Sequence, residues 1–220
     1  DKFIKDSAHE LNTPITVLMT SVSMLKNGKN PEKMMKYILS SSKQISQIYN
    51  DIHFSAFNEI NEDVFEEFDL KDLVAESTDY FNDISITKNI QINSNLFSCF
   101  IKMDKTKTQK LVNNLISNAI KYSHPEGKVV IAFSCNPDSW ILEIVDDGIG
   151  ISKKAQRQLF SEFYRGENAI NSKIVGSGIG LLLVKNYVEM HDGAVSCISN
   201  ENIGSTFKIE IPFKEASEEQ

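Results

Sequence analysis

The sequence contains little that would cross-link or anchor a fold. Its 220 residues include three cysteines, five prolines and ten glycines, and the cysteines lie far apart without C-x-x-C spacing. Neither a disulfide framework nor a zinc site is therefore expected, and a reducing compartment fits best. So few prolines and glycines exclude collagen and a mostly disordered chain. No run approaches the ~20 apolar residues that would cross a bilayer, which leaves a globular protein.

Positive charge is also scarce. The net charge of −7 argues against a nucleic-acid partner, because such proteins usually present a basic patch or stripe. The charge is uneven along the chain: residues 1–57 carry seven basic and five acidic groups, whereas residues 58–220 carry 16 and 25. This asymmetry predicts two units with different surfaces.

Two apolar stripes with helical spacing occupy the first 57 residues. One runs from Ile4 to Leu25 and the other from Met34 to Ile52, each in steps of three and four. Residues 27–31, Asn-Gly-Lys-Asn-Pro, supply a stop and a turn between them. We therefore expect a helical hairpin, residues 1–57, whose exposed seam is covered by a second copy in a homodimeric four-helix bundle.

The rest of the chain alternates short apolar runs with helical patterns. Residues 58–67 are acidic and weakly patterned, so they are interpreted as a linker. Over residues 68–220 we expect an α/β sandwich domain, a sheet with helices on one face. The expected helices cover 70–82, 106–122, 152–159 and 179–190, the strands 90–93, 100–103, 129–134, 141–145, 195–198 and 207–211, and a polar loop 164–177.

The most informative short segment is Ser-Ala-His-Glu-Leu-Asn-Thr-Pro at residues 7–14. His9 follows a seam position, so a rotation of roughly 100° places its imidazole beside the seam and toward water. Thr13 lies one turn further on the same face, where its hydroxyl could hold a water near a group attached to His9. The plain alternative is a surface histidine beside an incidental proline.

Two polar patterns in the second unit suit a nucleotide. Asn114 and Asn118 lie one turn apart on an otherwise apolar helix face, where oxygens of a ligand or Mg²⁺ would satisfy their amides. Asp146 ends an apolar strand and begins the pattern D-x-G-x-G, so its carboxylate could accept a hydrogen bond from the exocyclic amine of adenine. The alternatives are amides that cap loops and an ordinary Asp-Gly turn.

A glycine-rich segment, residues 176–181, opens the helix that runs to Met190. Backbone N–H groups at a helix N-terminus favour phosphate, although neither a P-loop nor a dinucleotide fingerprint is present. The preceding polar stretch follows Phe160, Phe163 and Arg165 and could form a flexible lid. A plain surface loop with an aromatic anchor is the alternative.

Taken together, H-E-x-x-T-P, N-x-x-x-N, D-x-G-x-G, F-x-x-F and G-x-G-x-G-L resemble, in this order, the H, N, G1, F and G2 boxes of sensor histidine kinases. The resemblance covers essentially the whole chain; Asn12 stands where the family usually has Arg or Lys. It implies that His9 accepts a phosphoryl group, that Glu10 orients or deprotonates it, and that Thr13 positions water. It implies ATP as substrate, Asn118 as the Mg²⁺ ligand, and a nucleotide site formed by Asn114, Asn118, Lys121, Tyr122, Asp146, Gly148, Gly150, Arg165, Gly176, Gly178, Gly180 and Leu181.

The resemblance also implies partners and a setting. They are a homodimer, the receiver domain of a response regulator, and an upstream sensor segment, either transmembrane or not, which would make this chain a cytoplasmic portion. A phosphatase-dominant protein or pseudokinase and an ATPase that drives conformational change remain as alternatives. Conformational ATPases of this fold place a glutamate in the nucleotide helix to activate water, and Asn114 at that position cannot act as a base.

Overall fold

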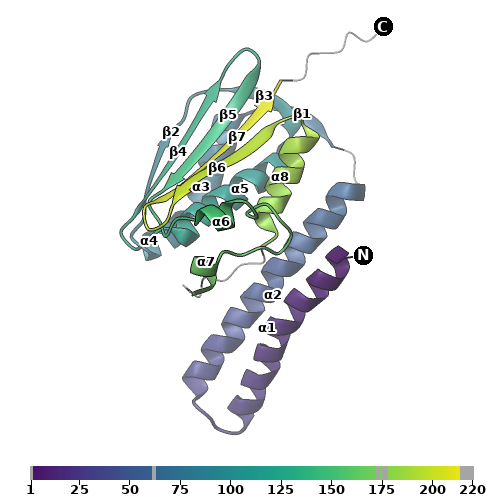
Figure 1. Ribbon diagram of the computed structural model, residues 1–220, viewed down its shortest axis with the longest axis vertical. Coiled ribbons are helices and arrows are strands. Elements are labelled where there is room, and N and C mark those ends of the chain that lie inside the picture. The colour runs from purple at the N-terminus through teal and green to yellow at the C-terminus, as the bar shows by residue number, and fades with distance from the viewer. Residues whose placement is uncertain (1, 61–62, 172–173, 175–177, 214–220) are drawn as a thin grey trace. The chain divides into compact units, whose positions relative to one another are not determined.

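The computed structural model describes residues 2–60, 63–171, 174 and 178–213, which divide into two units (Figure 1). The first contains the two N-terminal helices together with the segments 161–164 and 178–180. The second contains residues 63–160, 165–171, 174 and 181–213. Among the described helices, none is long and apolar enough to span a bilayer.

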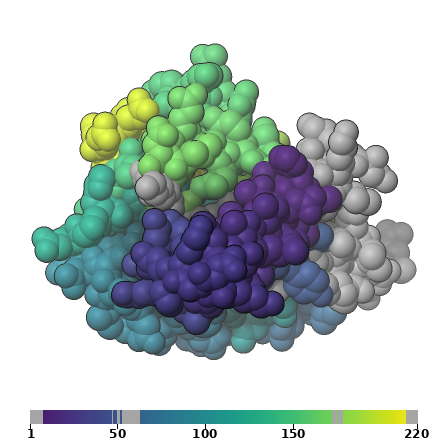
Figure 2. All heavy atoms as spheres, turned by 90° about the horizontal axis from the view of Figure 1, so that it is seen from below, coloured from purple at the N-terminus to yellow at the C-terminus, as the bar shows by residue number. Residues whose placement is uncertain are grey.

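The first unit is the expected helical hairpin. Helix α1 spans Lys2–Lys26 and α2 spans Pro31–Ile60, and the two pack against each other. Gly28 turns the chain with φ of 68°, and the Asn30 side chain accepts a hydrogen bond from Lys33 N–H at 3.2 Å in the first turn of α2. Figure 2 looks at the turn end, where the surfaces of both helices face the viewer in purple and indigo.

The second unit contains two sheets. The larger has five strands in the order β2-β4-β5-β7-β6, and β2 pairs parallel with β4 while all other pairs are antiparallel. The smaller is an antiparallel pair of β1 and β3. The strands are β1 Phe65–Asp69, β2 Gln91–Asn95, β3 Phe100–Asp104, β4 Lys128–Cys135, β5 Ser139–Asp146, β6 Ala194–Asn200 and β7 Gly204–Pro212.

Helices cover one face of the larger sheet, which confirms the α/β sandwich. Along β5 the alternate residues Trp140, Leu142 and Ile144 are buried, and they form one core with Leu111 and Leu115 of the longest helix of this unit. The helices are α3 Leu70–Tyr80, α4 Asn82–Thr87, α5 Lys105–Tyr122, α6 Lys153–Gln156, α7 Glu167–Asn171 and α8 Gly180–Met190 (Figure 1).

The expected linker is narrower in the structure. Helix α2 continues to Ile60, and residues 65–67, predicted as linker, are the first part of β1. The strand is acidic and mostly exposed, with only Phe68 buried, so it has no alternating apolar pattern to reveal it. Strand β1 forms instead by pairing with β3. The expected polar loop 164–177 also differs in the structure, because it contains the short helix α7.

The expectation that the cysteines form no disulfide was wrong. Cys99 and Cys135 form a disulfide, and Cys197 is free. The two bonded residues are 36 apart in sequence, but the pairing of strands around them brings their Cα atoms to 6.3 Å. This separation lies within the usual range for a disulfide, and sequence spacing carries no sign of it.

The N-terminus of α5 anchors the start of the second unit. Asp104 caps α5 by accepting from Lys107 N–H at 2.9 Å, and its other carboxylate oxygen accepts from Val64 N–H at 3.1 Å. The Lys107 ammonium pairs with Asp63, whose second oxygen lies 3.5 Å from His191 Nε2 at the end of α8. The Asp63–Lys107 ion pair and the Val64–Asp104 hydrogen bond therefore fix residues 63 and 64 to α5, and Asp63 also lies next to the end of α8.

Replacing Asp104 by alanine should lower the free energy of unfolding of the second unit by about 2 kcal/mol, because one substitution removes a helix cap and the acceptor for Val64 N–H. Urea denaturation followed by circular dichroism measures this change. Glu76→Ala on the exposed face of α3 is the control, and we expect it to stay within about 0.5 kcal/mol of the native chain. Equal stability of the two variants would contradict the role given to Asp104.

Candidate active site

The segment predicted to carry the nucleophile lies on a continuous helix. His9 and Thr13 are both exposed on α1, one turn apart, and Glu10 between them is half-buried. Pro14 is buried within the helix, and it has no N–H to donate to the Glu10 carbonyl. The imidazole of His9 is thus accessible to a molecule outside the hairpin, as the spacing predicted.

Asp146, the last residue of β5, supplies a buried carboxylate. One oxygen accepts from Gly148 N–H at 3.0 Å, and Ser205 on the neighbouring strand β7 also donates to the carboxylate. Burial, together with the negative charge of Asp147, raises the pKa of Asp146 to about 6, although these hydrogen bonds act in the opposite direction. Near neutral pH the group is therefore an ionised acceptor held in place by the backbone.

Glycines let the loop after β5 approach α5. Ile149 N–H donates to the Tyr122 carbonyl at 3.1 Å, and a Cβ atom on Gly148 would lie 2.1 Å from that carbonyl oxygen. Gly150 has φ of 61°, and a Cβ atom there would lie 1.9 Å from the Asn200 carbonyl oxygen. No side chain fits at either position, so both predicted glycines are explained by packing and conformation.

The amides predicted to bind a ligand lie on α5 and are half-buried. Among the described residues, Asn114 Nδ2 and the neighbouring Asn113 Oδ1 are buried without a hydrogen-bond partner. Because buried polar groups are nearly always paired, these atoms fit a ligand that supplies both acceptor and donor groups. Asn118 lies one turn after Asn114, at the end of α5 that meets Gly148.

The end of α5 also carries positive charge. Lys121 Nζ lies 5.7 Å from the centre of the Tyr122 ring, in a cation–π contact. Burial raises the pKa of the Tyr122 phenol, and the positive charge of Arg165 acts in the opposite direction. Two cations therefore lie within electrostatic reach of Tyr122, which suits an anionic ligand.

Two residues that the sequence analysis did not single out support this arrangement. Lys88 donates through Nζ to the carbonyls of Ile120 and Lys121 at 2.9 and 2.8 Å, which closes the C-terminus of α5. Asn168 of α7 donates through its amide to the Gly150 carbonyl. Neither residue stands in a sequence pattern that could have revealed its contact, because the partners lie 32, 33 and 18 residues away.

The remaining glycine-rich residues are distributed between the two units. Gly178 has φ of 75°, and a Cβ atom there would lie 2.7 Å from the backbone of Phe163, so these two predicted residues lie together in the first unit. Gly180 begins α8, and Leu181 packs against the core of the second unit. Gly176 lies outside the described residues.

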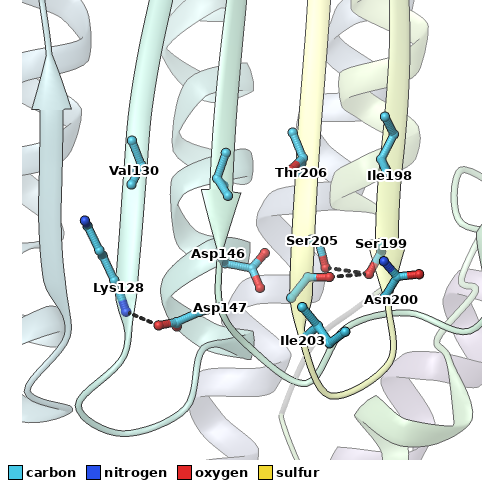
Figure 3. Close-up of a pocket in the computed structure, with 12 residues that line it drawn as sticks. Lys128, Val130, Asp146, Asp147, Ile198, Ser199, Asn200, Ile203, Ser205 and Thr206 are labelled. Atoms are coloured by element: carbon cyan, nitrogen blue, oxygen red, sulfur yellow. Dashed lines mark hydrogen bonds between the residues drawn. The ribbon is translucent and has the colours of Figure 1, made fainter.

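A pocket of about 350 Å³ opens on the other face of the sheet, and Asp146 and Asp147 at the end of β5 are among its lining residues (Figure 3). Its apolar lining includes Val130, Val145 and Ile198, which alternate with core residues along their strands. Asp147 accepts from Lys128 N–H at 2.8 Å at its edge. The pocket therefore lies away from the unpaired amides of α5.

In the described ranges, no group of three or more His, Cys, Asp or Glu side chains could hold a metal ion.

Two family models match the chain. The model described as histidine kinase-, DNA gyrase B- and HSP90-like ATPase matches residues 103–215, and the His Kinase A (phospho-acceptor) domain model matches residues 1–59. The first model alone accounts for more than half of the chain. The second match covers the helical hairpin, and the first begins within β3 and covers the larger sheet except β2.

Individual proteins show the same similarity. Sensor histidine kinase WalK of Bacillus subtilis is 26% identical over 99% of this chain, and sensor histidine kinase RppB of a Synechocystis strain is 29% identical over 96%. The matches cover 37% and 49% of those proteins, so the chain spans less than half of their length.

Among solved structures, histidine kinase AdeS of Acinetobacter baumannii superposes with a TM-score of 0.76 at 27% identity, covering 94% of this chain and 98% of that one. Family models, relatives and fold therefore agree on both units and on their order. The chain belongs to the sensor histidine kinase family.

Proposed function

We propose that the chain transfers the γ-phosphoryl group of ATP to His9 and then to an aspartate in the receiver domain of a response regulator. The observation that carries this proposal is the exposed His9 imidazole on α1, in a chain whose second unit has the features of an adenine nucleotide site. Membership of the family supports the same conclusion.

The nucleotide site is proposed around the junction of α5 with the loop after β5. An ionised Asp146 accepts from the exocyclic amine of adenine, and it disfavours guanine, whose carbonyl oxygen would face the carboxylate. Lys121 and Arg165 supply positive charge for the phosphates, and the unpaired Asn114 amide supplies hydrogen bonds. Gly148 keeps the loop after β5 against the end of α5, because a Cβ atom there would collide with the Tyr122 carbonyl oxygen.

A divalent cation fits this donor set. Mg²⁺ commonly uses only one or two protein ligands and completes its shell with water and phosphate oxygens. The Asn118 amide oxygen would hold it, beside the unpaired Asn114 amide one turn earlier on α5. When bound, Mg²⁺ supplies charge neutralisation for the phosphates.

The protein contributes position and proton handling to the transfer. A ring nitrogen of neutral His9 attacks the γ-phosphorus while the bond to the β–γ bridging oxygen breaks and ADP leaves. Glu10, the neighbouring carboxylate, accepts the proton from the other ring nitrogen or holds it through a hydrogen bond. The receiver aspartate then attacks the phosphorus, and His9 is regenerated.

A homodimer is part of the proposal. Apolar side chains on both helices of the hairpin remain exposed in the single chain, including Val17, Met19, Leu39 and Tyr49, with exposed fractions from 42% to 66%. Covering such a surface with a second hairpin gives a four-helix bundle, which is the usual solution for two amphipathic helices. Each bundle would then present two copies of His9.

His9→Gln should abolish incorporation of label from γ-labelled ATP, because the amide cannot replace the imidazole as nucleophile. Binding of a non-hydrolysable ATP analogue should stay unchanged, since His9 belongs to the other unit. His53→Gln, the second histidine of the hairpin, is the matched control and should label at the native rate. Labelling of the His9 variant at the native rate would refute the assignment.

Nucleotide affinity should depend on pH through Asp146. Its pKa of about 6 means that the acceptor is ionised above this pH and protonated below it, so affinity should fall by up to about tenfold per unit below pH 6. Titration calorimetry with a non-hydrolysable ATP analogue between pH 5 and 8 measures the change.

Two variants isolate the contribution of Asp146 from the titration of the phosphates. Asp146→Asn should bind weakly and lose the part of the pH dependence due to the carboxyl group. Asp147→Asn should keep that dependence with its midpoint at lower pH, because the negative charge that raises the pKa of Asp146 is removed. Parallel curves for the native chain and Asp146→Asn would exclude Asp146 as the titrating acceptor.

Removal of the phosphoryl group from the receiver is proposed as a second activity, with Thr13 holding the attacking water. Thr13→Ala should slow dephosphorylation of a receiver domain labelled by this chain at least tenfold and leave His9 labelling intact. Thr20→Ala, exposed two turns further on α1, is the control. Equal dephosphorylation rates for both variants and the native chain would remove Thr13 from the mechanism.

A further inference from the structure

The disulfide between Cys99 and Cys135 lies at one end of the larger sheet. Cys99 comes immediately before β3, and Cys135 is the last residue of β4, next to the hairpin that leads into β5. The bond therefore connects the loop between β2 and β3 to the β4–β5 hairpin, two segments that the nucleotide site does not use.

Contacts other than the bond hold both segments in place. Cys99 N–H donates to an Asp69 carboxylate oxygen at 2.9 Å, and its carbonyl accepts from Leu70 N–H at 2.9 Å. The ring of Phe97, two residues earlier, lies 4.6 Å from the ring of Phe133 on β4. These contacts do not involve the sulfur atoms, so we expect them to hold the two segments together when the bond is reduced.

The surroundings of the two cysteines can accommodate either free thiols or the disulfide. Cys99 belongs to the core and is 5% exposed, and a free thiol there packs as a small apolar side chain. Cys135 is half-buried where it packs against the same core, so it is the more exposed residue of the pair. A small thiol or disulfide can therefore react at Cys135, with Cys99 completing the exchange.

The geometry points to Cys99 and Cys135 as a reversible redox-modification site that exchanges with a small-molecule disulfide of the glutathione type. In oxidation, the Cys135 thiolate attacks glutathione disulfide and releases one glutathione. The Cys99 thiolate then attacks the Cys135 sulfur and releases the second. Two protein thiols thus lose two electrons and two protons, and one glutathione disulfide becomes two glutathiones. Reduction is the reverse.

The third cysteine does not compete in this exchange. Burial, together with the nearby negative charge of Asp146, raises the pKa of the Cys197 thiol to about 12. The thiolate is the reactive form, so Cys197 is nearly inert in the folded chain at neutral pH. It serves as an internal reference in the test.

The bond should change stability and leave nucleotide binding unchanged. Along β4, Val129 pairs with Asp146, whereas Cys135, six residues later, pairs with Trp140. At about 3.3 Å per residue, the bond is about 20 Å from the carboxylate proposed to bind adenine. Closing a loop of 36 residues constrains the unfolded chain, so the oxidised form should melt roughly 5–15 °C above the reduced form.

Counting thiols tests the site without any substitution. The native chain is equilibrated with glutathione buffers from fully reducing to fully oxidising, quenched with acid, and titrated with a thiol reagent in denaturant. We expect three reactive thiols under reducing conditions and one under oxidising conditions, with intact mass lower by two hydrogens. Three free thiols throughout, or stable glutathione adducts in place of the internal bond, would overturn the proposal.

Melting curves of variants test its consequence. The native chain and Cys197→Ser should both show the redox-dependent shift in melting temperature, and Cys135→Ser should show none. Cys135 is chosen because its partial exposure makes the serine variant more tolerant than one at Cys99. Affinity for a non-hydrolysable ATP analogue should agree within twofold between the two redox states. A redox-dependent shift that survives in Cys135→Ser would also refute the site.

Discussion

The contact between the loop after β5 and the end of α5 is the constraint on which the proposed nucleotide site depends. A hydrogen bond from Ile149 N–H to the Tyr122 carbonyl fixes their separation, and only glycine fits at position 148. This close approach brings a strand end that carries Asp146 to the helix that carries Asn114 and Asn118. Without this contact, Asp146 and the two amides could not bind the same nucleotide.

The two key groups of the proposed reaction, Asp146 and His9, lie in opposite environments. Asp146 is buried, so its pKa is raised and its ionisation becomes sensitive to pH near 6. His9 is exposed on α1 and open to a second molecule. A binding group gains selectivity from a fixed, desolvated environment, whereas a residue that must receive a phosphoryl group and then deliver it to another protein needs access. The second unit provides the buried binding group, and the first unit provides the exposed histidine.

The second unit is held together by interactions between segments that are distant in sequence. Asp63 pairs with Lys107 and lies near His191, so the start of the unit, α5 and the end of α8 meet in one largely buried polar cluster. Lys88 closes the C-terminus of α5 from the turn after α4. The disulfide joins a third pair of distant segments. Removing one partner of such a buried set is costly, because it leaves the others desolvated and unpaired.

The sequence by itself determined the hairpin, the α/β sandwich and most of the candidate residues, because apolar periodicity and short motifs are local properties. It could not indicate β1, whose acidic residues lack alternation, nor Lys88 and Asn168, whose partners are main-chain carbonyls. The tertiary structure alone decided that Cys99 and Cys135 are neighbours. The pairing of strands brings residues 36 apart to a Cα separation of 6.3 Å, and no pattern in the chain encodes that distance.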